Sequence, residues 1–433
     1  MDATTLATFR QAVHGSFARS GDALFELVDA LLTHPGARSF VELSEAPSCR
    51  RRWCSGYAAL QDGHIDRAAL RRAFVAALPP TPAGARLVLG LDTSPIHRPE
   101  AHTFPDRTLV YCPNLPHDAR PVRPGWQFST VVALPDPVSS WVYVLDNQRV
   151  ASAETAITVG AAQVRAVLPL LPARPILAAD GHYGCTAWVQ ATADVLCDQL
   201  LRTRRDRVLY RPAPPRTGQR GAPKKDGPRF QGSDPASHGT PDGHWEGADA
   251  AGRRVAVTWW ADLHLKACRA TPLTAVRIVR HHATGTARDP REAWFWWLGG
   301  PLPPAATLPD LYARRFGIEH GYKLQKQTLL WDAPRVRTPD QFARWTDVVA
   351  VAHNHLALAR PLVAVAHRPW EARAKPATPQ QVRRAMPRLL PQVGTPAAPP
   401  RPRGKSPGRA AGTPVKRAAR HPVLRKAAKR RAA

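Results

Sequence analysis

Two apolar runs, each with an aspartate near its end, constrain the fold of this chain more than any other feature. Residues 85–96 read ARLVLGLDTSPI, and residues 174–184 read RPILAADGHYG. Uninterrupted apolar runs of this kind are typical of strands that are buried on both faces of a sheet. The sequence therefore predicts an α/β fold, with Asp92 and Asp180 near the carboxyl ends of two interior strands.

Two strand patterns and one helix pattern separate these runs. Segments 128–136 and 140–150 have strand character and residues 152–171 have helical periodicity, so the order is β-β-β-α-β. Parallel neighbours need a crossover connection, and this helix can lay the Asp180 strand beside the Asp92 strand. The two carboxylates then meet where open α/β sheets bind ligands. Taken singly, each aspartate has a simpler interpretation as a turn residue or a helix N-cap.

The rest of the chain differs in composition and periodicity from this α/β segment. Helical spacing of apolar residues predicts a helical N-terminal domain over residues 1–84, used for DNA binding or docking. The α/β pattern occupies residues 85–370, and short strand patterns at about 205–300 interrupt it as a β-rich insertion. Residues 371–433 are rich in Pro, Arg and Ala, and the last 33 residues hold 12 Lys and Arg and no acid, which predicts a disordered basic tail.

The charge balance indicates a polyanionic partner. The 433 residues hold 61 Lys and Arg against 33 Asp and Glu, a net charge of +28. Nucleic acid is the first candidate, and no apolar run approaches the roughly 20 residues of a membrane-spanning helix. The N-terminus has no apolar signal-peptide segment, so we expect a cytoplasmic, nucleoid-associated protein with no membrane partner. Six cysteines without a C-x-x-C pair argue against a disulfide framework and a zinc ribbon.

A single carboxylate stands among cations in YARRFGIEHGYKLQKQ, residues 312–327. At 3.6 residues per turn, Tyr312, Arg315, Glu319 and Lys326 fall within an arc of about 60° on one helix face. Such a face suits a phosphodiester beside a metal ion, because the cations bind phosphate oxygens and the carboxylate binds the metal. The alternative is a solvated helix face with ordinary charge pairs.

These residues together resemble the bacterial insertion-sequence DDE transposases that carry the signature Y-(2)-R-(3)-E-(6)-K. The resemblance covers about residues 5–370 and implies an RNase H-like catalytic domain, a mixed sheet flanked by helices. It implies that Asp92, Asp180 and Glu319 are the catalytic metal ligands, for two ions of Mg²⁺ or Mn²⁺. Tyr312, Arg315 and Lys326 would bind phosphates of the transposon end.

The function that this resemblance implies is cut-and-paste transposition. Metal-activated water would nick DNA at the element end, and the freed 3′ hydroxyl would then attack target DNA. The partners would be terminal inverted repeats and target DNA, held by a homodimer. Two alternatives stay open: an RNase H-like nuclease without strand transfer, and a non-catalytic DNA-binding protein derived from a transposase. His182 departs from the expected pattern and either contacts DNA or packs, and no tryptophan is assigned to a flipped base.

Overall fold

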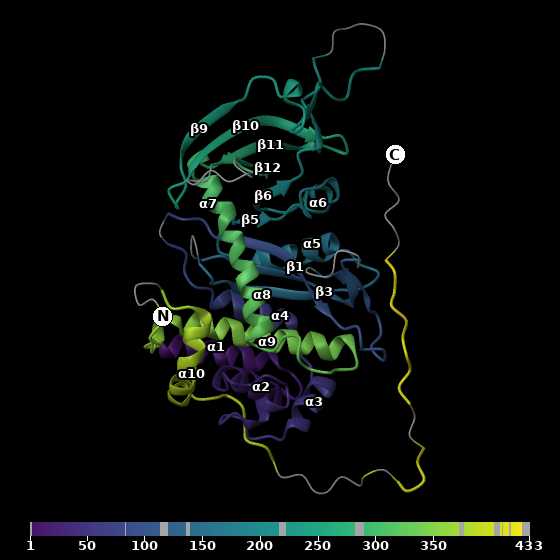
Figure 1. Cartoon of the computed structure of the whole chain (residues 1–433), viewed down its shortest axis with the longest axis vertical. Coiled ribbons are helices and arrows are strands. Elements are labelled where there is room, and N and C mark those ends of the chain that lie inside the picture. Colours follow the sequence, from purple (N-terminus) through teal and green to yellow (C-terminus); the bar gives the residue numbers. More distant parts are fainter. Residues whose placement is uncertain are drawn as a thin grey trace.

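The chain forms a mixed α/β structure in which one long sheet is flanked by helices (Figure 1). The computed structural model describes residues 2–82, 84–112, 120–135, 139–215, 222–281, 290–371, 376–401, 408, 410–414 and 417–426. Over these ranges no helix combines the length and the apolar character that crossing a bilayer requires.

The α-helices are α1 (Ala3–Ser16), α2 (Gly21–Thr33), α3 (Trp53–Asp62), α4 (Arg67–Ala76), α5 (Ala156–Val167), α6 (Thr186–Ala191), α7 (Leu308–Ala313), α8 (Gly317–Gln327), α9 (Pro339–Ala359) and α10 (Pro379–Val393). The strands are β1 (Val88–His97), β2 (Thr108–Tyr111), β3 (Val122–Ala133), β4 (Tyr143–Val150), β5 (Ile176–Ala179), β6 (Asp198–Thr203), β7 (Val208–Tyr210), β8 (Arg229–Gln231), β9 (Gly243–Ala248), β10 (Arg254–Leu265), β11 (Cys268–Arg280) and β12 (Arg291–Leu298). Short 3₁₀ helices are η1 (Glu42–Glu45), η2 (Leu168–Leu170), η3 (Pro235–Ser237), η4 (Ala305–Thr307), η5 (Arg314–Phe316) and η6 (Arg360–Leu362).

The first half of the sheet has the strand order that the sequence predicts. β1 pairs antiparallel with β3, and β3 pairs antiparallel with β4. After the α5 crossover, β5 pairs parallel with β1, with Leu91 opposite Ala179, which confirms that the Asp180 strand lies beside the Asp92 strand. β6 continues the parallel part beside β5. β2 is an additional edge strand, whose four residues are too few for a clear period-two pattern.

The strands between residues 205 and 300 extend this same sheet. β12 pairs antiparallel with β6, β11 with β12, and β10 with β11, and β9 and β7 both pair with β10. Figure 1 shows β9 to β12 at one end of the molecule and the N-terminal helices at the other, with α7 and α8 running between them. Trp294, Trp296 and Trp297 of β12 are buried and belong to the core.

The N-terminal helices pack against α9. The Phe40 ring lies 5.2 Å from the Trp345 ring, and Arg67 of α4 donates to the buried Asp347 carboxylate at 3.0 Å. Burial raises the pKa of Asp347 to about 6, although Arg67 opposes this shift. Because buried apolar and ionic contacts join these helices to α9, the first 84 residues share a core with the later helices.

Residues 379–393 differ from the expected disordered tail, because they form α10. Thr378 and Gln381 make a capping box, and Val382 and Met386 are fully buried on one face of the helix. The buried Arg383 donates to the carbonyls of Leu31 and His34, which end α2. The prediction of disorder used the average composition of residues 371–433, which is basic, and it missed this short amphipathic segment. The apolar face of the segment is large enough for a helix to form when it packs against α2.

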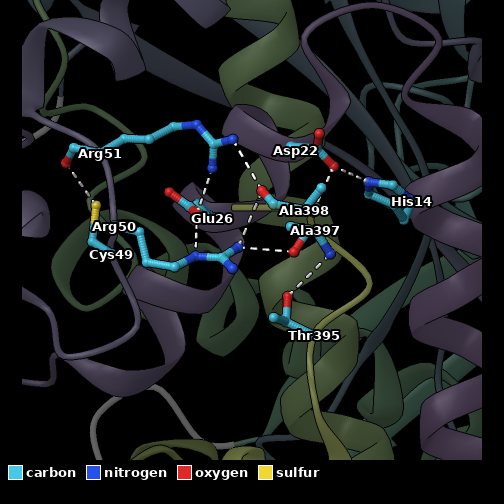
Figure 2. Close-up of polar contacts among 9 residues, drawn as sticks. All are labelled: His14, Asp22, Glu26, Cys49, Arg50, Arg51, Thr395, Ala397 and Ala398. Atoms are coloured by element: carbon cyan, nitrogen blue, oxygen red, sulfur yellow. Dashed lines mark hydrogen bonds and ion pairs between the residues drawn. The ribbon is translucent and has the colours of Figure 1, made fainter. Parts of the chain in front are cut away.

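The segment after α10 is bound to the N-terminal helices by arginines (Figure 2). Arg50 donates to the Ala397 carbonyl at 2.8 Å, and Arg51 donates to the Ala398 carbonyl at 3.0 Å. Both guanidiniums also pair with the buried carboxylate of Glu26, at 2.7 and 2.5 Å. These N-terminal cations therefore hold the chain's own C-terminal segment.

A buried histidine makes this helical core sensitive to acid. His355 of α9 lies between the rings of Phe9 and Phe25, and burial lowers its pKa to about 3. Because the unfolded chain binds a proton at His355 below about pH 6.5 and the folded chain binds it only near pH 3, the folded state loses stability as the pH falls between these two values. From pH 8 to pH 5 we expect His355 alone to cost about 2 kcal/mol of unfolding free energy.

Denaturant unfolding of the parent and of His355→Leu at pH 8 and pH 5 measures this contribution. The loss of stability between the two pH values should be about 2 kcal/mol smaller in the variant. Equal losses in both proteins would show that His355 does not carry the acid sensitivity.

Candidate active site

The sheet brings Asp92 and Asp180 side by side. Leu91 and Ala179 are the last parallel partners of β1 and β5, so the next residue on each chain is an aspartate. Asp180 directly follows β5, as the sequence predicts. Asp92, however, lies in the middle of β1, because β1 continues to His97 through its pairing with β3. The carboxylates are thus neighbours at the point where the parallel pairing ends.

Close packing puts α8 on the same sheet face as Asp92. A Cβ atom on Gly90, two residues before Asp92, would lie 2.5 Å from the Ile318 side chain of α8. Side chains two residues apart on a strand share a face, so α8 covers the Asp92 face. Leu91 points to the other face, where a Cβ on Gly160 of α5 would lie 3.1 Å from it.

The four signature residues do not lie on one straight α-helix. Tyr312 belongs to α7, Arg315 to the 3₁₀ turn η5, and Glu319 and Lys326 to α8. The tighter turn changes the angular step between residues, so the predicted arc of about 60° does not apply across the whole segment. Arg315 and Glu319 remain four residues apart, and their charged groups are 3.6 Å apart.

Arg315 joins two of the three predicted catalytic acids. Its Nη1 donates to Asp92 Oδ2 at 2.7 Å, and its Nη2 lies 3.6 Å from Glu319 Oε1. The Arg315 and Asp92 side chains are only 13% and 17% exposed, whereas Glu319 is 51% exposed. The guanidinium therefore lies where it partly neutralises a buried acid, while Glu319 faces solvent.

Two further contacts tie α8 to β1. The Tyr322 hydroxyl donates to the Asp92 carbonyl at 3.0 Å, and Lys326 Nζ donates to the Pro95 carbonyl at 2.6 Å. Burial lowers the pKa of Lys326. Lys326 thus holds the helix against the strand, a role that its spacing in the signature does not reveal.

The electrostatics of the site centre on Asp92. Burial, opposed by Arg315 and assisted by the neighbouring Asp180, raises the pKa of Asp92 to about 6. The Asp92 carboxyl is therefore mainly ionised at neutral pH and mainly protonated below pH 6. The neighbouring Tyr183 hydroxyl is buried, and burial together with Asp92 raises its pKa.

The acids do not yet form a closed metal site. Over the described ranges, no group of three or more His, Cys, Asp or Glu side chains is arranged to hold one ion. Asp92 and Asp180 are adjacent, but Arg315 lies between Asp92 and Glu319. Carboxylate oxygens are nevertheless the ligands that Mg²⁺ and Mn²⁺ prefer. Asp92, Asp180 and Glu319 therefore have the right chemistry to bind such an ion, although Arg315 donates to Asp92 Oδ2 in this structure.

A cavity of about 780 Å³ opens beside these residues. Its lining includes Asp180, His182 and Arg315 together with Arg202, Arg204 and Arg205. His182 is exposed, and its backbone N–H donates to Asp180 Oδ1 at 3.0 Å, so its ring lies in the cavity wall and outside the core. The sequence could not single out these three arginines as site residues, because no motif distinguishes them from the many other arginines of the chain.

Comparison with known families agrees with this arrangement. The sequence profile of the DDE superfamily endonuclease family matches residues 9–263, which is more than half of the chain and includes Asp92 and Asp180. The chain belongs to this family. The match of the DDE superfamily endonuclease profile ends before Glu319, so the roles of Glu319 and its neighbours rest on the geometry above. No curated protein matches the sequence.

Proposed function

We propose that this DDE superfamily endonuclease is a cut-and-paste DNA transposase of an insertion sequence. The supporting observation is the juxtaposition of Asp92 and Asp180 on the sheet face that α8 covers, with Glu319 on that helix. The order of three antiparallel strands, a crossover helix and a parallel strand supports an RNase H-like catalytic domain.

Asp92, Asp180 and Glu319 would hold the Mg²⁺ or Mn²⁺ ions. When bound, such ions activate water and stabilise the charge of the attacking and leaving oxygens in phosphoryl transfer. Asp92 Oδ2 can bind a metal ion only after its hydrogen bond from Arg315 is broken. A DNA phosphate would give the Arg315 guanidinium another anion to bind. Arg315 would then move from carboxylate to phosphate as substrate binds, which leaves Asp92 Oδ2 for a cation.

The DNA contacts expected of Tyr312, Arg315 and Lys326 differ in how directly the geometry supports them. Arg315 lines the cavity beside Asp180, so it is well placed for a phosphate. Tyr312 lines an adjoining cavity of about 540 Å³. Lys326 already donates to Pro95, so we propose that it acts mainly by positioning α8.

A transposition assay tests this function against its alternatives. The DNA that flanks the reading frame is searched for inverted repeats, and a marked element bounded by those repeats is supplied with the protein. Excision and insertion of the marker, with Mg²⁺ or Mn²⁺, is the expected result. Hydrolytic cleavage without insertion would identify a nuclease, and DNA binding without cleavage would identify a non-catalytic derivative; either result would contradict the proposal.

A further inference from the structure

Arg202 of β6 lies in the same cross-strand row as the two aspartates. Leu91 is opposite Ala179, and Ala179 is opposite Leu201, so the next residue on each strand gives the row Asp92, Asp180, Arg202. Neighbouring strands are about 4.8 Å apart. The backbone of Arg202 is therefore about 5 Å from that of Asp180, within reach of any phosphate held by the acids.

The row continues onto β12 and β11 on the face that α7 covers. Arg202 is opposite Phe295, whose ring lies 4.6 Å from the ring of Tyr312 on α7. Arg291 lies four residues before Phe295 and therefore shares its face. Arg291 is opposite Arg280 of β11, so two more cations follow Arg202 along the same surface.

Two adjoining cavities cover this surface. The cavity beside Asp180 and the 540 Å³ cavity beside Tyr312 share Arg202, Glu292 and Ala293 in their walls. Seven arginines line the two cavities together, against three acidic residues. Within the described parts of the chain, Arg202 and Arg291 are exposed and form no ion pair with a carboxylate, whereas Arg280 donates to the Pro309 carbonyl at 2.7 Å. The groove is thus positively charged, and Arg202 and Arg291 are among its cations that are free to bind an anion.

We propose that Arg202 and Arg291 bind two phosphates of one DNA strand that runs from the three acids across β6 and β12. This inference rests on the proposed function, because the acids fix where the strand begins. Arg202 binds the phosphate beside the one that is cut, and Arg291 binds the backbone further along the groove. The insertion strands therefore extend the DNA-binding surface of the active site.

Salt titration of DNA binding tests this path. We would measure the affinity of the full chain for a fluorescein-labelled 40-base-pair duplex of random sequence at several salt concentrations. The variants are Arg202→Ala, Arg291→Ala and Arg202→Lys. Arg165→Ala is the control, because Arg165 lies on α5, which covers the opposite face of the sheet, and its side chain is 45% exposed. Thermal melting of each variant verifies that it folds.

Each alanine variant in the groove should lower the slope of log affinity against log salt by about 0.9, the value for one lost phosphate contact. Arg202→Lys should restore the slope, because lysine still binds phosphate as a point charge. Arg165→Ala should match the parent. Parent-like slopes in Arg202→Ala and Arg291→Ala would overturn the proposed path.

Glu319→Gln, added to these variants, separates the failure of this inference from failure of the proposed function. If Glu319→Gln abolishes metal-dependent nicking of supercoiled plasmid while the alanine variants bind as the parent does, the catalytic centre of the proposed function stands and the path is wrong. If the parent neither binds nor nicks DNA, both the function and the path are wrong.

Discussion

Glu319→Gln is expected to reduce Mg²⁺-dependent DNA cleavage by about a hundredfold or more while DNA binding persists. The substitution keeps the shape of the side chain and removes the charge that would hold a cation. Glu319 is 51% exposed and its one ion pair over the described ranges, to Arg315, is 3.6 Å long, so the fold should not change. Nicking of supercoiled plasmid and binding to the same DNA would be measured side by side.

Glu246→Gln is a matched control for this substitution. Glu246 of β9 is 52% exposed and lies 3.5 Å from an arginine, Arg254, so it resembles Glu319 in burial and in its arginine partner, although it also lies 3.2 Å from His244. It lies outside the residues that line the cavity beside Asp180. Parent-like cleavage is expected from Glu246→Gln. Parent-like cleavage from Glu319→Gln would mean that the helix is an ordinary solvated surface.

Deleting residues 376–433 is expected to lower the unfolding temperature by about 10 °C or more. The deletion removes the fully buried side chains of Val382 and Met386, each of which stabilises the fold by about 1.5–3 kcal/mol. It also removes the Gly394 carbonyl that accepts from the Nε of the buried Arg10, and a buried donor left without an acceptor is costly, although Arg10 keeps its ion pair with Asp29. Thermal melting of the purified chain would report the change.

A shorter deletion, of residues 401–433, distinguishes α10 from the basic segment beyond it. This variant keeps α10 and the Ala397 and Ala398 carbonyls that Arg50 and Arg51 bind. The deletion removes surface contacts and one acceptor of the buried Arg107, the His421 carbonyl, while Arg107 keeps the Arg98 and Pro99 carbonyls. The unfolding temperature of this variant should therefore remain within about 4 °C of the parent. If both deletions melt alike, the helix does not stabilise the N-terminal core.

The pairing of Asp92 with Asp180 could be predicted from the sequence because its causes are local. Two apolar runs define the interior strands, and the crossover rule then brings the strands together. The position of α8 could not be predicted in the same way. It depends on the absence of a Cβ at Gly90, which lets Ile318 approach the sheet, and this contact joins residues more than 200 positions apart.

Three other features could not be predicted, because the sequence patterns were averaged over long segments or because the residues involved are far apart in the sequence. A helical projection treats residues 312–327 as uniform, whereas the turn at Arg314–Phe316 interrupts the helix. The composition of the whole tail hides the apolar face of α10. The alignment of Arg202 with the aspartates follows from the pairing of β5 with β6, and no short motif encodes it.

The most direct test of the metal-dependent active site is to locate the metal itself. Crystals of the full chain with duplex DNA and Mn²⁺ would be measured at the manganese absorption edge, where anomalous scattering marks each ion. We predict a peak beside the carboxylates of Asp92 and Asp180 with Glu319 at its periphery, and Arg315 turned from Asp92 toward a phosphate. A DNA-bound structure with no manganese at these acids, and with Arg315 still paired to Asp92, would contradict the proposed catalytic centre.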